Sequence, residues 1–205
     1  MPFLDFLRPS HKKRGSAQLA RVKFVASQFG PHIPGLGKAY HTSVLVDNIE
    51  YEFGGAGVTK SKGPASHARF EGHCEIIDLG TTEVSIKGMM ALLAPYFAPG
   101  SYDMLRKNCN SWTRCAVYYL TRMHIDPKYN SLESIGWKLD SYTALVRMVW
   151  SDYQPNPLAE GFSVELVLQD VDFHREQAMA EGTEEGRASK VLNAVQRKAR
   201  GSVQM

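Results

Sequence analysis

Apolar residues recur with helical spacing in the stretch that follows residue 108. They lie three or four residues apart, which places them on one face of an α-helix: Trp112, Cys115, Ala116, Tyr119, Leu120 and Met123. Counting back three residues from Trp112 puts Cys109 on the same face, in the first turn. Asn108, immediately before it, is a residue type that commonly caps helices. We therefore expect a helix capped by Asn108, with its apolar stripe in the core and Cys109 facing the surface on which it packs.

β-rich runs separated by glycine- and proline-rich stretches predict a small sheet. The runs are 22–29, which ends at Gly30-Pro31, then 40–46, 49–55 and 70–79, the last most clearly β from residue 74 onward. Residues 31–38 are predicted to form a loop. Residues 54–68, which are rich in glycine, serine and lysine, are predicted to form an exposed loop and a candidate wall of a substrate groove.

A histidine lies near the start of a predicted hairpin. The runs 40–46 and 49–55 flank a tight turn at Asp47-Asn48, which is typical of a β-hairpin. His41 shares a period-two face with Ser43 and Leu45, so we expect its side chain to point inward.

Four further segments show helical patterns. Thr81 or Thr82 is expected to cap a helix that ends at Pro95, with its apolar face at Ile86, Met89, Met90 and Leu93. Beyond the Cys109 helix, the pattern predicts helices over 141–153, 163–180 and 184–200. The last of these is basic and amphipathic from Arg187 to Arg200, which suits either a solvated helix or one that binds an acidic partner or a membrane surface.

Composition and charge narrow the class of protein. The net charge of +3 on 205 residues is too small to indicate nucleic-acid binding, and the basic residues concentrate near the two ends. An odd number of cysteines, three, argues against a disulfide framework and for a reducing compartment. No run approaches membrane-spanning length, and an acid and two prolines interrupt the apolar start. We expect a soluble intracellular protein, cytoplasmic and also nuclear, without stable membrane insertion.

The pattern of elements indicates an α+β protein with one main domain. We expect a small antiparallel sheet or barrel packed on helices, with additional C-terminal helices. The predicted organisation is a basic N-terminal segment over 1–18, a domain over 19–125, and a mainly helical extension over 126–205 that packs on the domain up to about residue 180.

The order of histidine strand, further strands and capped cysteine helix suggests a nucleophilic pair. Backbone N–H groups and the helix dipole favour a thiolate in a first helical turn. Taken alone, however, Cys109 also fits a small core residue and His41 a structural strand histidine. Papain-like enzymes place a cysteine at a helix N-terminus and a histidine on a strand, and here the histidine comes first, as a circular permutation would require.

Several short motifs in this order resemble the PPPDE family of permuted papain-fold peptidases, which includes the desumoylating isopeptidases. The motifs lie between Val22 and Leu120: His41-Thr42-Ser43-Val44, Tyr51-Glu52-Phe53-Gly54, Gly57-Val58, Leu79-Gly80-Thr81-Thr82, Tyr102-Asp103 and Asn108-Cys109-Asn110. The resemblance implies a permuted papain-like fold and a thiol isopeptidase that removes ubiquitin or a ubiquitin-like modifier from proteins. Its catalytic residues fall on His41 and Cys109.

The chemistry implied by the resemblance needs no cofactor or metal. His41 would take the thiol proton and return it to the departing lysine amine, while the Cys109 sulfur attacks the isopeptide carbonyl. The backbone N–H of Cys109 would be one oxyanion donor, and the sequence assigns no second donor. No orienting acid is marked either: Asp47 and Asp78 are candidates that fit turn or surface roles better.

Departures from the family pattern leave other functions open. This chain carries Trp112 where family members often have phenylalanine, and nearly eighty residues after Met123 lie beyond the resemblance. The lecithin:retinol acyltransferase-like group also has a histidine before an Asn-Cys motif, so a lipid acyltransferase or hydrolase, or a thioesterase, is one alternative. A non-catalytic binding scaffold is another. The oligomeric state does not follow from the sequence.

Overall fold

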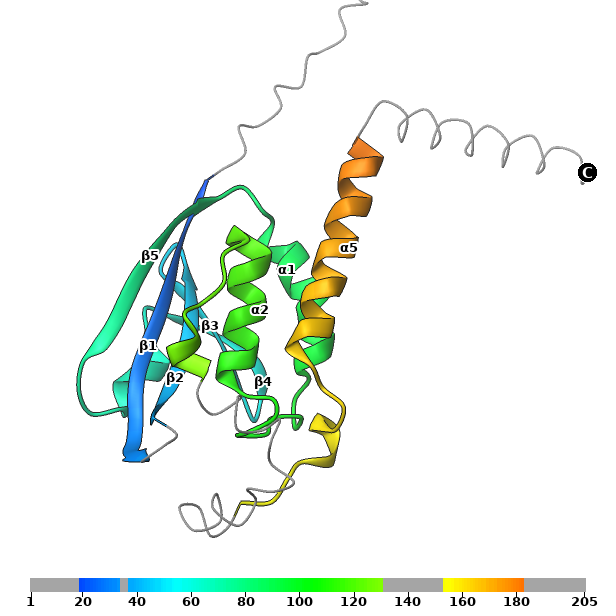
Figure 1. The fold of residues 1–205 in the computed structure, drawn as a ribbon. Helices are drawn as coiled ribbons and strands as arrows, with labels where there is room; N and C mark the ends of the chain where they lie inside the picture. Colours follow the sequence, from blue (N-terminus) through cyan, green and yellow to red (C-terminus); the bar gives the residue numbers. More distant parts are fainter. Residues whose placement is uncertain (1–18, 34–36, 131–152, 183–205) are drawn as a thin grey trace, which may run out of the picture.

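The computed structural model describes residues 19–33, 37–130 and 153–182 as a sheet covered on one side by helices (Figure 1). Five strands form one antiparallel sheet in the order β4-β3-β2-β1-β5. Their bounds are Ala20–Ile33 (β1), Gly37–Val46 (β2), Ile49–Gly54 (β3), Gly57–Lys62 (β4) and Cys74–Thr82 (β5). The α+β prediction is confirmed in its sheet form, because β4 and β5 are the two edges of an open sheet and no barrel closes.

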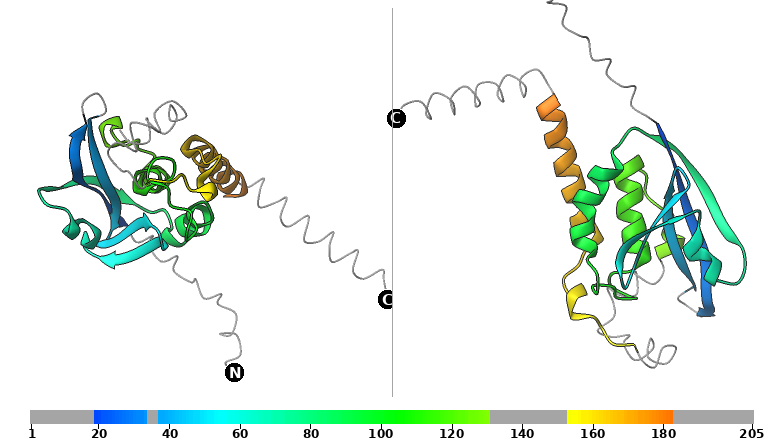
Figure 2. Two further views of the ribbon diagram at one scale, coloured as in Figure 1. Left: turned by 90° about the horizontal axis from the view of Figure 1, so that it is seen from below. Right: turned by 180° about the vertical axis from the view of Figure 1, so that it is seen from behind.

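The helices form two layers on this sheet. Helix α2 (Cys109–Thr121) packs on β2 and β3, with α1 (Ile86–Leu93) beside it. Helix α5 (Val164–Gly182) packs on α2 from the other side, as the views in Figures 1 and 2 show. Within the described residues, the connections contain four 3₁₀ helices: Ala65–Arg69 (η1), Ala94–Phe97 (η2), Pro127–Asn130 (η3) and Pro157–Ala159 (η4). None of the helices in the described part of the chain is long and apolar enough to cross a membrane.

The core lies between the sheet and α2. Trp112 is fully buried, and its indole N–H donates to the Tyr51 carbonyl at 3.2 Å. Phe97 makes an edge contact with Trp112, at 5.3 Å between ring centroids. Val167 and Val171 of α5 join the same cluster from the outer layer. The apolar stripe predicted for the Cys109 helix is therefore the centre of the core.

The start of α2 has the cap that the sequence predicts. The Asn108 side-chain oxygen accepts from the backbone N–H groups of Asn110 (2.9 Å) and Ser111 (3.2 Å). Ser111 Oγ in turn accepts from the Asn108 N–H at 3.1 Å, which completes a capping box. The helix ends at Thr121, where Arg122 adopts a left-handed conformation, so Met123 was wrongly assigned to the buried stripe and is 46% exposed.

The predicted hairpin is confirmed and other boundaries need correction. Asp47 and Asn48 have φ values of 48° and 66°, the pair of left-handed residues that a two-residue hairpin turn requires. The loop predicted over 31–38 is wrong at both ends, because β1 continues to Ile33 and β2 already begins at Gly37. The pairing is interrupted at Gly30-Pro31, between Phe29 and Ile33, and resumes where Ile33 lies opposite Gly37.

The segment 54–68 is not the exposed loop that the sequence predicts. It contains β4, which pairs along the whole of β3, and most of η1. Polar composition misled the prediction, because Ser66 and His67 are buried by hydrogen bonding rather than by apolar packing. The cap of α1 also differs: Thr81 and Thr82 belong to β5, and the Ser85 side chain accepts from Gly88 N.

The later helices agree with the prediction where the chain is described. The helix predicted over 163–180 is α5, whereas those over 141–153, except for Tyr153, and 184–200 lie outside the described residues. The segment before α5 contacts the loop that leads to Cys109. The Tyr153 hydroxyl (3.0 Å) and the Asn156 backbone N–H (2.8 Å) both donate to the buried Asp103 carboxylate.

Replacement of Asn108 by alanine tests the cap. The variant loses the two hydrogen bonds accepted from the first turn of α2 and the one donated to the Met104 carbonyl. This should destabilise the protein by about 1–2 kcal/mol, the upper range for caps, because the site is buried. Urea unfolding followed by circular dichroism measures the change. The control is Ser85→Ala at the more exposed cap of α1, which should cost about 0.5–1 kcal/mol. Equal losses of unfolding free energy in the two variants would contradict the expectation that the Asn108 cap contributes more to stability than the Ser85 cap.

Candidate active site

His41 and Cys109 come together where β2 meets the start of α2. The residues that follow them are also joined, because the Thr42 hydroxyl donates to Asn110 Oδ1 at 2.8 Å. His41 is 3% exposed and Cys109 is 4% exposed. The Cys109 side chain lies close enough to the His41 ring to raise the pKa of His41. The structure thus brings together both residues that the sequence singles out.

The other partners of His41 lie on η1 and β3. Its Nε2 atom is 2.7 Å from Ser66 Oγ and 3.4 Å from Glu52 Oε2. The rings of His67 and Phe70 pack against it at 4.7 and 5.0 Å between centroids. The imidazole is therefore fixed in its orientation by contacts on several sides.

The surroundings of His41 favour its protonated form. Burial alone favours the neutral ring, but the attraction of Cys109 and Glu52 for the protonated ring outweighs it and raises the pKa of His41 to about 9. The same contact with His41 lowers the pKa of Glu52. A histidine in this state is suited to pair with a thiolate.

A buried carboxylate lies behind Ser66. Glu50 has no exposed surface, and its two oxygens accept four hydrogen bonds: Ser43 Oγ (2.7 Å), Ser66 Oγ (2.7 Å), Ser61 Oγ (2.9 Å) and Ser66 N (2.9 Å). Burial raises the pKa of a carboxyl group, but these hydrogen bonds outweigh it and hold the pKa of Glu50 below its usual value. Glu50 is therefore a buried anion.

A second histidine completes the buried polar network. His67 Nδ1 is 2.9 Å from Ser27 Oγ, and its Nε2 is 2.9 Å from Ser43 Oγ. Burial, with the charge on His41, lowers the pKa of His67 to about 4. His67 is thus neutral near pH 7 and connects hydroxyl groups without carrying charge.

Tyr102 contacts Cys109 from the loop before α2. Burial, followed by the effect of the neighbouring Cys109, raises the pKa of Tyr102, so the hydroxyl keeps its proton. The Asn108 side chain accepts from the backbone N–H groups of Asn110 and Ser111, and not from that of Cys109.

Several residues of this site were not found from the sequence. Glu50, Ser66 and His67 were assigned no functional role, although Glu50 and Glu52 alternate with the core residues Tyr51 and Phe53, a signal of acids on one strand face. Asp47 and Asp78, the acids considered earlier, bind Arg21 instead, through its backbone N–H and its guanidinium respectively. Among the described residues, no three His, Cys, Asp or Glu side chains are grouped to hold a metal ion.

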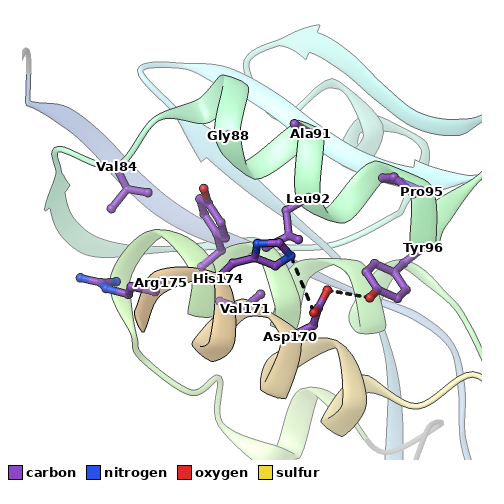
Figure 3. Close-up of a pocket in the computed structure, with 11 residues that line it drawn as sticks. Val84, Gly88, Ala91, Leu92, Pro95, Tyr96, Asp170, Val171, His174 and Arg175 are labelled. Atoms are coloured by element: carbon purple, nitrogen blue, oxygen red, sulfur yellow. Dashed lines mark hydrogen bonds and ion pairs between the residues drawn. The ribbon is translucent and has the colours of Figure 1, made fainter. Parts of the chain in front are cut away.

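A cavity of about 830 Å³ lies elsewhere, between α1, α2 and α5 (Figure 3). Val84, Leu92 and Val171 contribute to its apolar lining. Asp170 is the acid in its lining, and it lies 2.7 Å from the Tyr96 hydroxyl and 3.8 Å from His174 Nε2. Figure 3 marks both contacts with dashed lines. Neither His41 nor Cys109 lines this cavity, so it is separate from the candidate active site.

Comparison with known proteins shows that the chain matches a protein family. Residues 10–150 match the family described as "PPPDE putative peptidase domain". DeSI-like protein sdu1 from Schizosaccharomyces pombe is 26% identical to the chain over 117 residues, which are 53% of this chain and 58% of that relative. The chain therefore spans less than two thirds of the length of the relative. Helix α5 lies outside the matched residues.

The pH dependence of stability tests the neutral state of His67. Because its folded pKa of about 4 lies below the ordinary 6.5, the unfolded chain binds more protons between these values, and stability should fall as the pH falls through this window. The loss is up to about 3 kcal/mol. Urea unfolding at about pH 7 and about pH 5 measures it.

The variant His67→Gln should flatten this dependence, because glutamine has donor and acceptor atoms but does not titrate. His174→Gln, at a half-exposed histidine, is the control and should leave the dependence unchanged. An unaltered slope in His67→Gln would show that His67 is not the responsible group.

Proposed function

The chain belongs to the PPPDE peptidase family, and from this premise we propose that it is a thiol isopeptidase that removes ubiquitin or a ubiquitin-like modifier from proteins. Cys109 is the proposed nucleophile and His41 the proposed base, a Cys-His dyad that needs no cofactor. The observation that carries the proposal is the buried position of these two side chains beside each other, where β2 meets the N-terminus of α2.

The reaction follows from this pair. His41 removes the thiol proton, and the Cys109 sulfur attacks the carbonyl carbon of the isopeptide bond to form a tetrahedral intermediate. His41 then gives the proton to the lysine nitrogen as the carbon–nitrogen bond breaks, which leaves the modifier joined to Cys109 as a thioester. Water, deprotonated by His41, attacks the thioester and releases the modifier carboxylate and the free thiol.

The backbone N–H of Cys109 is the proposed oxyanion donor. It lies in the first turn of α2, where the helix dipole favours negative charge, and the Asn108 cap accepts from the N–H groups of Asn110 and Ser111 rather than from this one. A substrate oxygen bound at this N–H would receive a stronger hydrogen bond as it became charged.

Two observations favour a modifier conjugate as the substrate. The S. pombe relative carries the name DeSI-like, which agrees with the resemblance to desumoylating isopeptidases. The dyad is also almost completely buried, and a chain end made of glycines, as in ubiquitin, can approach a recessed sulfur more closely than residues with side chains can. We propose a cytoplasmic and nuclear location, in keeping with the three free cysteines.

The proposed domain division is 1–18, 19–125 for the peptidase, and 126–205 for the extension. The extension contributes Tyr153 and Asn156 to the loop before the nucleophile, since both donate to Asp103. Helix α5 adds an outer layer to α2. We propose that this part supports the position of the Cys109 loop, with ubiquitin-like conjugates as the partners of the whole protein and neither nucleic acid nor an inserted membrane segment involved.

A panel of ubiquitin-family activity probes tests nucleophile and substrate together. The wild type should form a covalent adduct with at least one modifier probe, and Cys109→Ser should lose it, as seen by mass shift. The matched control is Cys115→Ser, at a buried cysteine of the same helix, which should keep the adduct. Turnover of a short-chain thioester without reaction with any modifier probe would overturn the isopeptidase assignment.

Alkylation by iodoacetamide tests the dyad without a substrate. Cys109 should react faster than the more exposed Cys74 despite its burial, because His41 promotes the thiolate. His41→Ala should lower the Cys109 rate by about 10–100-fold and leave Cys74 unchanged. Peptide mapping by mass spectrometry gives the three rates. Slow and equal labelling of all cysteines would favour a scaffold without catalysis.

A further inference from the structure

Behind the dyad, the hydrogen bonds run in one direction from His41 to a buried acid. We propose that Glu50, acting through the Ser66 hydroxyl, is the positioning residue that keeps the Nε2 proton of His41 in place and stabilises its imidazolium form. This inference rests on the proposed function, in which His41 is the base for Cys109. It supplies the orienting acid that the sequence does not mark.

The donors and acceptors leave one arrangement for the Ser66 hydroxyl. An ionised carboxylate only accepts, so the single Ser66 proton is used in its 2.7 Å hydrogen bond to Glu50 Oε1. Ser66 Oγ can then only accept from His41 Nε2, which is also 2.7 Å away. The Nε2 atom must therefore carry a proton. In the neutral ring, Nδ1 is then the atom that can accept the proton of the Cys109 thiol.

The buried charge of Glu50 gives this chain of hydrogen bonds an electrostatic role. All four donors to Glu50 are neutral groups. Within the part of the chain that the structure describes, the basic side chain within 4 Å of Glu50 is His67, whose Nε2 is 3.5 Å away. Because His67 stays neutral, the complementary positive charge develops on His41, beyond Ser66, when the thiol proton reaches it.

Glu52 is the competing candidate for the orienting acid. Its Oε2 atom is 3.4 Å from His41 Nε2, longer than a normal N–H to oxygen hydrogen bond. It is also partly exposed and shared with Arg69 at 3.5 Å, which offsets its effect on His41. The Ser66 contact is shorter and fully enclosed. We therefore assign orientation to Ser66 and Glu50, and to Glu52 an additional attraction for the charged ring.

The proton that moves in the reaction does not pass along this chain. It goes from the Cys109 sulfur to His41 Nδ1 and then to the leaving lysine nitrogen, while Nε2 keeps its own proton throughout. Ser66 and Glu50 exchange no proton and make no covalent bond. Their effect is to select the ring tautomer and to lower the energy of the imidazolium and thiolate pair relative to the neutral pair.

Two serine variants distinguish the positioning of His41 by Ser66 and Glu50 from a general contribution of these residues to folding stability. Ser66→Ala and Ser61→Ala each remove one hydroxyl donor from Glu50, but only Ser66 contacts His41. The first readout is the rate of Cys109 alkylation by iodoacetamide against pH. The second is kcat/KM against pH with the modifier substrate that reacts in the probe panel. Thermal unfolding of both variants measures the structural cost.

Of the two alanine variants, only Ser66→Ala should shift the alkaline side of the profile of kcat/KM against pH. Activity should decline in the wild type as pH rises through about 9, where His41 loses its proton. Ser66→Ala removes the hydroxyl oxygen that accepts from His41 Nε2. The decline in activity should then occur at a pH lower by about one unit, and Cys109 alkylation near neutral pH should be slower by about tenfold. Ser61→Ala should leave the pH of the decline unchanged. Ser66→Thr, which keeps a hydroxyl, should restore it.

Two outcomes would overturn the inference. Equal shifts in Ser66→Ala and Ser61→Ala would mean that the network only supports the fold. A shift in Glu52→Gln without one in Ser66→Ala would make Glu52 the orienting acid. Failure of the proposed function is separate: if no modifier probe reacts but alkylation of Cys109 depends on His41 and Ser66 as stated, the positioning role stands and the isopeptidase assignment falls.

Discussion

The burial of an ionised carboxylate, that of Glu50, is the constraint on which the arrangement of this site depends. A charge removed from water must be surrounded by donors, since an unsatisfied buried anion would cost several kcal/mol. Glu50 meets this requirement with donors from three elements, β2, β4 and η1. The hydrogen bonds to this one carboxylate therefore fix the positions of the polar side chains near His41.

The packing of α2 on β2 and β3 is the second condition for the candidate active site. Its cap orients the first turn, and Trp112 anchors the helix to β3 both by burial and by its hydrogen bond to Tyr51. The Thr42 to Asn110 contact then sets the helix against β2 one residue beyond His41 and Cys109. Two rigid elements, each fixed by contacts outside the dyad, thus hold the two side chains next to each other.

The region beyond the family match is tied to the same loop as the nucleophile. Asp103 turns the chain before Cys109 by accepting from the backbone of Leu105 and Arg106, and it also accepts from Tyr153 and Asn156. A change in the extension can reach the Cys109 loop through this carboxylate, and also through the Asn156 side chain, which donates to the Gly100 and Tyr102 carbonyls. The apolar cavity under α5, in contrast, shares none of its lining with the dyad.

Parts of this structure could be predicted from the sequence because they depend on interactions between residues that are close together in the chain. The α2 helix was predicted because a capping asparagine and an apolar stripe act within a few residues, and the 47–48 turn because it needs residues that tolerate positive φ. His41 and Cys109 were identified by their motifs in order. The folding of 54–68 onto β3 was missed, and with it Ser66, His67 and the role of Glu50. Only the tertiary structure decides these, because a serine, a histidine or a glutamate is buried when distant elements supply its hydrogen-bond partners, and its local sequence resembles that of an exposed residue.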